Sequence, residues 1–276
     1  MNKRIAIQGF QASFHETAAF QFFGDEIALL ECATFQQLFT AMKSGKSDFG
    51  ICAFENALAG SILSNYALLR NSNLEIFGEV YLCIEMNLLV LAGQSIDEIE
   101  EIHSHPMALL QCQHFLEQYP HIRLVESSDT GFAAKEIAEK QIKNRAAIAS
   151  SRAGEVYNLQ TLAGDIHDNK RNFTRFLALR KRNGELVKGI NKSSISFRAN
   201  HTAGSLAKIL TIIGEHDINL NKIQSLPVVG EEWKYFFYVD LRFEDFANYR
   251  KMMDEIEPLT RELKILGEYQ QGEKPV

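Results

Sequence analysis

One short segment, N-F-T-R-F, carries three polar side chains that could act together in a binding site. A threonine hydroxyl is too weak an acid to release a proton outright, but when positioned it can donate a hydrogen bond to a departing oxygen. In a strand, alternate side chains share a face, so Asn172, Thr174 and Phe176 should point one way. Either the strand begins irregularly, or Arg175 supports the site from behind, for example by pairing with Glu55.

Other polar residues follow expected strands or open expected helices. Asn56 could bind a carboxylate or a carbonyl at a strand end, whereas Glu55 beside an anion would need a cation or a raised pKa. Ser13 opens a helix, where its hydroxyl and backbone N–H groups could bind a carboxylate. Thr130 opens another helix in the same way. We expect Asp129, just before it, to be a helix cap rather than a ligand.

Strand-like and helical patterns alternate over the first 180 residues. We expect helices at 14–23, from Thr34 with Gln37 completing a capping box, at 66–70, from Pro106 to about 119 and at 129–141. We expect strands at 4–8, 27–32, 48–54, 80–91 (one long or two short), 101–104, 123–126, 146–150 and 174–180. This alternation indicates an α/β domain with a mainly parallel sheet. His105, just before Pro106, is either a helix cap or a catalytic residue.

The pattern changes near residue 181. Residues 181–192 are polar and contain glycine, which is typical of a linker. The elements expected beyond it are a strand (194–199), a helix (204–215), two strands (219–229 and 233–243), a helix (246–256) and a strand (263–269). This β-α-β-β-α-β order predicts a separate ferredoxin-like domain.

The composition excludes several classes of protein. Hydrophobic residues make up 46% and charged residues 23%, which is typical of a globular protein, and the net charge of -6 does not favour nucleic acid or an anionic membrane. No stretch approaches the roughly 20 apolar residues that span a bilayer, and the first apolar run is too short for a signal peptide. Four widely spaced cysteines form no C-x-x-C pair, so neither a zinc site nor a disulfide framework is expected. We expect a cytoplasmic protein.

Six segments, in order, resemble motifs of the prephenate dehydratase family. They are G-F-Q-A-S-F-H from residue 9, A-F-E-N-A-L-A-G-S from 53, H-S-H-P-M-A-L-L-Q-C from 103, S-D-T-G-F-A-A from 128, A-A-I-A-S from 146 with Asp168 and the N-F-T-R-F segment, and I-N-L-N-K-I-Q-S-L-P from 218. Together they cover nearly the whole chain. One such match would be weak evidence, whereas six in the family's order are strong.

The resemblance implies a fold class: α/β, with a two-lobed catalytic domain like type II periplasmic binding proteins and a C-terminal ferredoxin-like (βαββαβ) ACT regulatory domain. The catalytic domain would span 1–181, with one lobe at about 1–77 and 160–181 and the other at about 78–159, and the ACT domain would span 193–271. The family often carries a fused chorismate mutase domain at its start. Here the catalytic domain begins at Lys3, so we expect a monofunctional enzyme. ACT domains commonly pair edge to edge, so a homodimer or homotetramer is expected.

The resemblance also implies the reaction. Prephenate would lose water and carbon dioxide to give phenylpyruvate, a step in L-phenylalanine biosynthesis. Aromatisation drives this reaction, so the enzyme has mainly to hydrogen-bond the leaving hydroxyl and hold the dianion, and no metal or cofactor is required. Thr174 would be the catalytic donor. The expected substrate-binding residues are Ser13, Glu55, Asn56, Thr130, Asn172, Arg175 and Phe176.

L-phenylalanine is the effector expected for the C-terminal domain. Its expected binding residues are Asn200, Ala203, Gly204, Ser205, Leu206, Asn219, Gln224 and Ser225. The family's E-S-R-P is Q-S-L-P here, without either charge, so the strength of feedback stays open. Binding could persist through backbone groups at the turn 200–206, which opens a helix.

Two alternatives remain open. Arogenate dehydratase carries out the same elimination on the aminated substrate, and one or two pocket contacts would decide between the two. A non-catalytic, two-lobed module that senses an amino acid would not need Thr174. The departures from the family's motifs at Ala53, Ala57 and Met107 remove no residue that the chemistry needs.

Overall fold

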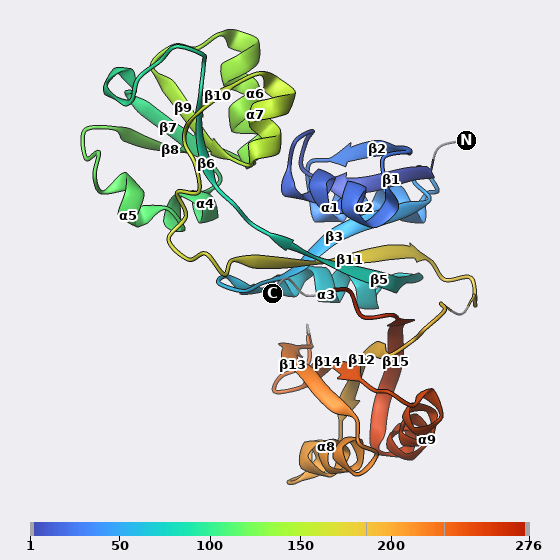
Figure 1. The fold of residues 1–276 in the computed structure, drawn as a ribbon. Coiled ribbons are helices and arrows are strands. Elements are labelled where there is room, and N and C mark those ends of the chain that lie inside the picture. The colour runs from blue at the N-terminus through green and yellow to red at the C-terminus, as the bar shows by residue number, and fades with distance from the viewer. Residues whose placement is uncertain (1–2, 186, 229, 274–276) are drawn as a thin grey trace. The chain divides into compact units, whose positions relative to one another are not determined.

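The computed structural model describes residues 3–185, 187–228 and 230–273 (Figure 1). Its chain forms two compact units, one made of residues 3–62 and Val80–Phe176 and the other of Leu63–Glu79 and Leu177–Glu273. Strands β5 (Leu74–Cys83) and β11 (Phe173–Lys181) carry the chain from one unit into the other. The last residue of the strand predicted at 219–229 lies outside the described residues.

The first lobe of the first unit is a small parallel sheet. Strands β1 (Lys3–Gln8), β2 (Ile27–Cys32) and β3 (Phe49–Asn56) pair in the order β3-β1-β2, and β4 (Gly60–Ser61) pairs antiparallel with β3. Helices α1 (Phe14–Phe23) and α2 (Phe35–Lys43) connect the strands. The central strand β1 buries three consecutive apolar residues, as a strand covered on both faces should.

The predicted capping box at α2 forms with a shift of one residue. The Thr34 hydroxyl accepts a hydrogen bond from the Gln37 N–H at 3.2 Å. The Gln37 side chain accepts from the N–H of Ala33, at 2.9 Å, rather than from that of Thr34. Both bonds satisfy backbone donors that would otherwise lack partners at the start of the helix.

The second lobe holds a five-stranded mixed sheet. Its strands are β6 (Asn87–Val90), β7 (Glu101–Ser104), β8 (Arg123–Glu126), β9 (Arg145–Ala149) and β10 (Gln160–Ala163), in the order β10-β6-β9-β7-β8. Strand β7 is parallel to β8 and β9, whereas β6 is antiparallel to β9 and β10. Strand β10 pairs with β6 of this sheet, so residues 160–163 belong to the second lobe. The chain therefore returns to the first lobe after residue 163, slightly later than the predicted boundary at about 160.

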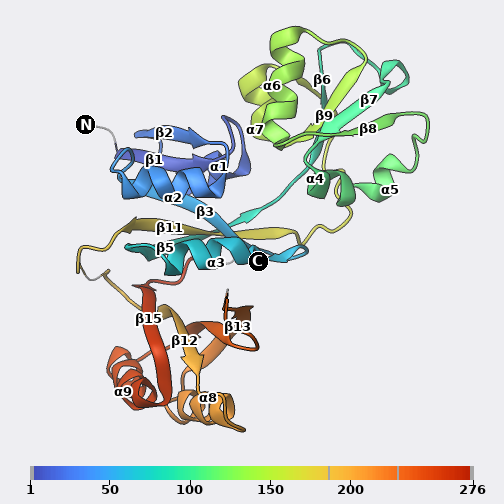
Figure 2. The same cartoon turned by 180° about the vertical axis from the view of Figure 1, so that it is seen from behind.

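Apolar clusters cover both faces of this sheet. Ala146 and Ile148 of β9 belong to one cluster, and Ala147 and Ala149 belong to the other. The second cluster includes residues of α6 (Thr130–Lys140) and α7 (Ser151–Tyr157), which lie side by side in Figures 1 and 2. The first includes residues of α4 (Pro106–Leu110), α5 (Gln113–Leu116) and the 3-10 turn η1 (Ile96–Glu98). The prediction of one helix from Pro106 to about 119 is therefore wrong, because the helix is interrupted after Leu110.

The second unit contains the predicted βαββαβ order. Its elements are β12 (Lys192–Ala199), α8 (Ser205–Glu215), β13 (Asn219–Pro227), β14 (Tyr235–Arg242), α9 (Phe246–Ile256), the 3-10 turn η2 (Glu257–Leu259) and β15 (Thr260–Tyr269). The sheet order is β13-β14-β12-β15, and all these pairs are antiparallel. Figure 2 shows α8 and α9 together on one face, where they enclose an apolar core. The ferredoxin-like topology is confirmed.

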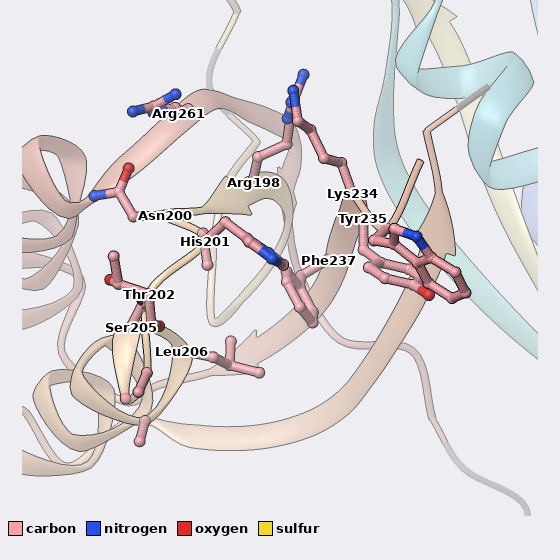
Figure 3. Close-up of a pocket in the computed structure, with 15 residues that line it drawn as sticks. Arg198, Asn200, His201, Thr202, Ser205, Leu206, Lys234, Tyr235, Phe237 and Arg261 are labelled. Atoms are coloured by element: carbon pink, nitrogen blue, oxygen red, sulfur yellow. Dashed lines mark hydrogen bonds between the residues drawn. The ribbon is translucent and has the colours of Figure 1, made fainter. Parts of the chain in front are cut away.

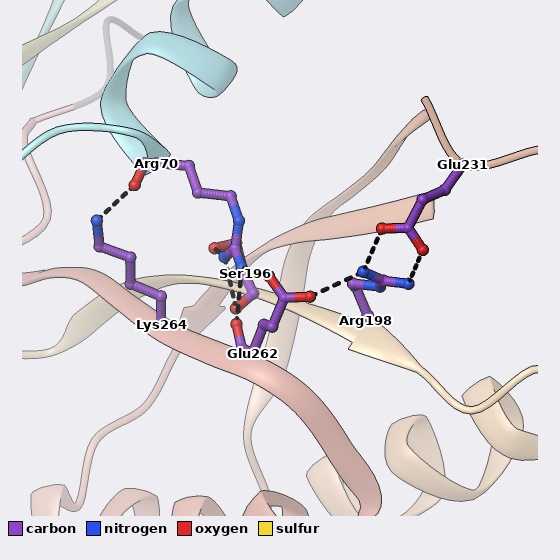
Figure 4. Close-up of polar contacts among 6 residues, drawn as sticks. All are labelled: Arg70, Ser196, Arg198, Glu231, Glu262 and Lys264. Atoms are coloured by element: carbon purple, nitrogen blue, oxygen red, sulfur yellow. Dashed lines mark hydrogen bonds and ion pairs between the residues drawn. The ribbon is translucent and has the colours of Figure 1, made fainter. Parts of the chain in front are cut away.

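Helix α3 (Leu63–Arg70) packs on the opposite face of this sheet. The Tyr66 and Tyr238 rings meet edge-on at 5.3 Å, and the Arg70 guanidinium lies 3.7 Å from the centre of the Phe236 ring. Arg70 also reaches β12 and β15 through hydrogen bonds to Ser196 and to the Glu262 carbonyl (Figure 4). This explains why β14 alternates two sets of aromatic residues, since both of its faces are covered.

Strand β5 joins the same unit through one close backbone contact. Gly267 of β15 pairs in parallel with Ile76 of β5. A Cβ atom on Gly267 would lie 2.2 Å from the Ile76 carbonyl oxygen, so a side chain there would push the two strands apart.

Among the described residues, every helix is too short or too polar to cross a lipid bilayer. The four cysteines, Cys32, Cys52, Cys83 and Cys112, are free thiols.

Candidate active site

A cavity of about 380 Å³ lies in the first unit, with walls from both lobes. This volume is in the range of small-molecule sites. The first lobe contributes residues of β1, α1, α2 and β3, and the second contributes residues near α4 and the start of α6. Its lining residues are Gln8, Phe14, His15, Phe35, Ala53, Asn56, Ala59, Ile62, Ile84, Met86, His105, Met107, Ala108, Gln111, Ser128, Asp129, Thr130, Thr174 and Phe176.

The orientation of the Thr174 hydroxyl follows from the amide of Asn56. The Asn56 Oδ1 accepts hydrogen bonds from the N–H groups of Leu58 and Ala59, at 3.0 and 2.8 Å. Its Nδ2 must therefore face the other way, where it donates to Thr174 Oγ1 at 3.0 Å. This bond uses a lone pair of the Thr174 oxygen and not the hydroxyl hydrogen. The hydrogen is therefore available for a ligand in the cavity. Thr174 is therefore able to donate a hydrogen bond to a ligand.

A chain of amides continues from this pair to the second lobe. Asn56 Nδ2 also donates to Asn172 Oδ1 at 2.8 Å, and Asn172 Nδ2 donates to Gln111 Oε1 at 2.9 Å. Asn172 is fully buried. Each amide fixes the direction of the next, so Asn172 orients Asn56 and Gln111. Asn172 does not itself line the cavity.

The segment before α1 forms another wall. Ser13 is buried and caps α1, since its hydroxyl accepts from the Glu16 N–H at 3.4 Å. His15 Nε2 accepts from the Ala53 N–H at 3.2 Å, and burial lowers the pKa of His15 to about 3. His15 is therefore neutral, and its ring meets Phe176 edge-on at 5.0 Å. It supports the shape of the cavity rather than its charge.

The start of α6 supplies the polar wall of the second lobe. Asp129 caps this helix by accepting from the Phe132 N–H at 3.1 Å, as predicted. Thr130 is the first residue of the helix and is buried at the cavity. His105 caps α4, with Nδ1 accepting from the Met107 N–H at 3.2 Å. This leaves its Nε2 as the nitrogen that carries the hydrogen in the neutral ring.

Arg175 lies on the other face of β11 from Thr174. Its side chain is only 5% exposed and does not line the cavity, and its Nη1 lies 3.8 Å from Glu55 Oε2.

Four of the predicted site residues line the cavity, namely Asn56, Thr130, Thr174 and Phe176. The other four, Ser13, Glu55, Asn172 and Arg175, lie behind it.

Several lining residues were not predicted as ligands. Gln8 precedes the Gly9 turn and His15 follows it. Gln111 belongs to the H-S-H-P-M-A-L-L-Q-C segment. The signal for Gln111 was its place in a segment that resembles the family, where an amide could bind either a substrate or a neighbouring side chain. Nothing in the local sequence pointed to Gln8.

A second cavity, of about 540 Å³, lies in the ferredoxin-like part of the second unit (Figure 3). It surrounds the turn before α8, where Gly204 has a φ of 78°. Five of the predicted effector residues line it, namely Asn200, Ala203, Gly204, Ser205 and Leu206; Asn219, Gln224 and Ser225 do not. Aromatic side chains and the cations Arg198, Lys234 and Arg261 complete the lining.

The fold and the cavity together define a two-lobed α/β domain with a cavity between its lobes, followed by a ferredoxin-like domain. The chain belongs to the prephenate dehydratase family, whose model, described as "Prephenate dehydratase", matches residues 5–184. A curated relative, the bifunctional chorismate mutase/prephenate dehydratase of Aquifex aeolicus, is 34% identical over 268 residues, which cover 96% of this chain and 73% of the relative. The arogenate dehydratase/prephenate dehydratase 2 of Arabidopsis thaliana is 35% identical over 283 residues, covering 96% and 72%.

Solved structures show the same fold over nearly the whole chain. A prephenate dehydratase from Arthrobacter aurescens, in complex with L-Phe, has a TM-score of 0.87 at 24% identity and covers 97% of this chain and 89% of its own. A chain described as a novel type of quorum-quenching acylase has a TM-score of 0.88 at 28% identity, covering 98% of both chains.

Proposed function

We propose that this protein converts prephenate to phenylpyruvate, with loss of water and carbon dioxide, in the biosynthesis of L-phenylalanine. The observation that carries the proposal is the Thr174 hydroxyl, which accepts from Asn56 and so can donate into the cavity. Membership of the prephenate dehydratase family supports the same reaction.

The proposed mechanism needs a donor and a shaped cavity. Thr174 donates a hydrogen bond to the ring hydroxyl as it departs. The C–C bond to the ring carboxylate breaks, its electron pair enters the ring as carbon dioxide is released, and the departing hydroxide takes a proton from solvent to become water. The donor stabilises negative charge on the leaving oxygen at the moment it develops. Thr130, the first residue of α6, binds a carboxylate, while Phe14, Phe35 and Phe176 pack against the ring. Fixing the substrate in this geometry contributes much of the rate.

A turnover assay tests this function. We expect the purified protein to form phenylpyruvate from prephenate, followed by its absorbance in alkali, at a rate well above the slow reaction without enzyme. Absence of turnover would favour the alternative of a non-catalytic sensing module.

We propose that residues 1–181 form the catalytic domain and residues 193–271 an ACT regulatory domain that binds L-phenylalanine. The cavity at Gly204 supports this, because it combines apolar walls from Leu206 and Phe237 with basic side chains (Figure 3). The start of α8, an 11-residue helix, can receive the amino-acid carboxylate. Assembly into a homodimer or homotetramer through this domain and a cytoplasmic location stay predictions.

L-phenylalanine is expected to raise the melting temperature of the protein. At about 100 times the dissociation constant, binding stabilises the folded state by about 2.7 kcal/mol, which corresponds to a rise of roughly 5–10 °C. Removing positive charge by Arg261→Ala should reduce this rise, measured by differential scanning fluorimetry. Arg242→Ala is the matched control, since Arg242 is also an exposed arginine but does not line the cavity. An unchanged melting temperature at millimolar phenylalanine would argue against the effector site.

An acylase function is less well supported by the same geometry. Acyl transfer by threonine requires a neighbouring base that accepts the hydroxyl proton. The hydrogen-bond partner of Thr174 is the amide of Asn56, which cannot act as a base. The pKa of His15 is lowered by burial, and its Nε2 is occupied by the Ala53 N–H. The cavity therefore favours hydrogen-bond donation over nucleophilic attack.

A further inference from the structure

The cavity at Gly204, called the effector cavity below, has cations in its wall that already hold carboxylates. Arg198 donates to both oxygens of Glu231, at 3.0 and 2.8 Å, and to Glu262 Oε1 at 2.8 Å (Figure 4). Lys234, another residue of the wall, donates to Glu231 Oε2 at 2.7 Å. A ligand carboxylate in this cavity therefore competes with Glu231 and Glu262 for the cations that they bind.

An irregularity in β15 places Glu262 at this contact. Ser196 of β12 pairs with Lys264, and Arg198 pairs with Arg261, so β15 has one extra residue between the two pairs. Glu262 lies in this bulge with a φ of 52°, a left-handed conformation that is uncommon for a residue with a side chain. Bulges of this kind redirect side chains. Here both the carboxylate and the carbonyl oxygen of Glu262 contact arginines.

The second arginine that Glu262 contacts is Arg70, the last residue of α3 (Figure 4). Its Nη2 donates to the Glu262 carbonyl at 2.9 Å and to Oε2 of the carboxylate at 3.3 Å. The Arg70 side chain is only 8% exposed. Lys264 holds the same end of the helix, since its ammonium donates to the Ser72 carbonyl at 2.8 Å and to the Arg70 carbonyl. Glu262 thus joins the end of α3 to the wall of the effector cavity.

Glu262 also compensates two positive charges that lie close together. The guanidinium groups of Arg70 and Arg198 lie 3.7 and 5.7 Å from the centre of the same Phe236 ring. Burial lowers the pKa of Arg70, and the charge of Arg198 lowers it further. Tyr238 and Glu262 act in the opposite direction and raise it. The contact between Glu262 and Arg70 therefore depends on how Arg198 is paired.

Helix α3 follows directly from the wall of the active-site cavity. Its first residue, Leu63, comes after Ile62, which lines that cavity. Gly60, two residues earlier, pairs with Asn56 of β3, whose amide orients the Thr174 hydroxyl. A displacement of α3 is therefore transmitted by the chain itself to the pair of strands that holds Asn56.

We propose that Arg198, Glu262 and Arg70 form a relay that couples the effector cavity to α3, and so to the active site. A ligand carboxylate in the cavity draws Arg198 away from Glu262, and the released carboxylate shifts together with Arg70 and the end of α3. Glu262 is a positioning residue in this relay, since it acts through the two arginines. The inference rests on the proposed effector site for L-phenylalanine and names the side chains that carry its regulation.

Hydrogen–deuterium exchange with and without L-phenylalanine tests the relay. In the wild type, saturating phenylalanine should change the exchange rates of α3 amides by about fivefold or more, the lower end of typical coupling between sites. Glu262→Gln keeps the side-chain length and the carbonyl that accepts from Arg70, but removes the charge. In this variant the change in α3 should fall below about twofold. Phenylalanine should bind it as tightly as the wild type or more tightly, measured by calorimetry, because Glu262 no longer competes for Arg198.

Prephenate turnover gives a second readout. The factor by which phenylalanine changes kcat/KM should fall toward 1 in Glu262→Gln, while kcat/KM without phenylalanine stays the same. Arg70→Gln breaks the other end of the relay, and the double variant should lose no more coupling than either single variant. Glu255→Gln is the matched control, because Glu255 is 56% exposed, compared with 52% for Glu262, and pairs with His216 at 3.0 Å. Neither Glu255 nor His216 lines the effector cavity, so this variant should behave as the wild type does.

The possible outcomes separate the relay from the proposed function. If α3 of Glu262→Gln still responds fully to phenylalanine, the relay is wrong. If binding weakens together with the response, Glu262 supports the effector site itself, and the relay is again wrong. A wild-type protein that binds no phenylalanine contradicts the effector site and the relay together. A wild-type protein that binds phenylalanine but does not turn over prephenate contradicts the dehydratase function, and the exchange experiment still decides on the relay.

Discussion

Replacing Thr174 by alanine should lower kcat for prephenate by about 100- to 1,000-fold, with a much smaller effect on KM. Loss of one donor to a developing oxyanion costs about 2.7–4 kcal/mol of transition-state stabilisation. The effect should appear mainly in kcat, because the hydrogen bond strengthens only as the hydroxyl leaves. Steady-state kinetics with prephenate measure both constants.

Thr174→Ser and Thr40→Ala serve as controls for this prediction. Serine restores the hydroxyl that accepts from Asn56, so Thr174→Ser should recover most of the lost kcat. Thr40 is exposed on α2, where its hydroxyl donates to the Gln36 carbonyl at 2.7 Å, and its replacement should leave kcat unchanged. A kcat for Thr174→Ala within about fivefold of wild type would remove Thr174 from the mechanism, since a lost oxyanion donor costs far more.

The elements that local sequence specifies were predicted well. The bounds of β2, α1 and α9 agree with the predicted ranges 27–32, 14–23 and 246–256. Each has a clear boundary signal, such as the capping residues Ser13 and Asp245. Where periodicity and caps agree, the neighbouring residues alone determine the element.

The broken helix after Leu110 shows what local sequence cannot determine. The run from Pro106 to Tyr119 has residues that favour a helix, yet the carbonyl of Gln111 accepts from the Asp168 N–H, at 2.8 Å. Asp168 Oδ1 in turn accepts from the His114 N–H at 3.2 Å. A segment more than 50 residues away in the chain thus supplies the partners that interrupt the helix. The break also places the Gln111 side chain at Asn172.

The candidate site was predicted in part for a similar reason. Strand alternation correctly separates Thr174 from Arg175, because it depends on neighbouring residues only. Resemblance to a motif cannot distinguish a residue that touches a ligand from one that orients it, and so Asn172 was predicted as a ligand. Its amide contacts Asn56 and Gln111, which lie 116 and 61 residues earlier in the chain. Long-range amide contacts of this kind become visible only in three dimensions.

Replacing Lys192 by methionine should lower the free energy of unfolding of the second unit by about 3–5 kcal/mol, the cost of breaking a buried ion pair. Lys192 of β12 and Glu79 of β5 are only 1% and 4% exposed, and Lys192 Nζ lies 2.8 Å from both carboxylate oxygens of Glu79. Without the ammonium, Glu79 would remain a buried charge, with the Gly272 N–H at 3.2 Å as a weaker donor. Urea unfolding followed by circular dichroism measures the difference.

The double variant with Glu79→Met and Lys192→Met separates the cost of an unpaired charge from the value of the pair. Two apolar side chains of similar length should restore most of the lost stability, because neither charge then has to be desolvated. Lys234→Met is the matched surface control. It removes a half-exposed lysine that lies 2.7 Å from Glu231, and it should cost no more than about 1 kcal/mol. If Lys192→Met were as mild as this control, water would have to reach Glu79 in the folded protein, and β5 would not be held tightly beside β15, the strand between it and β12.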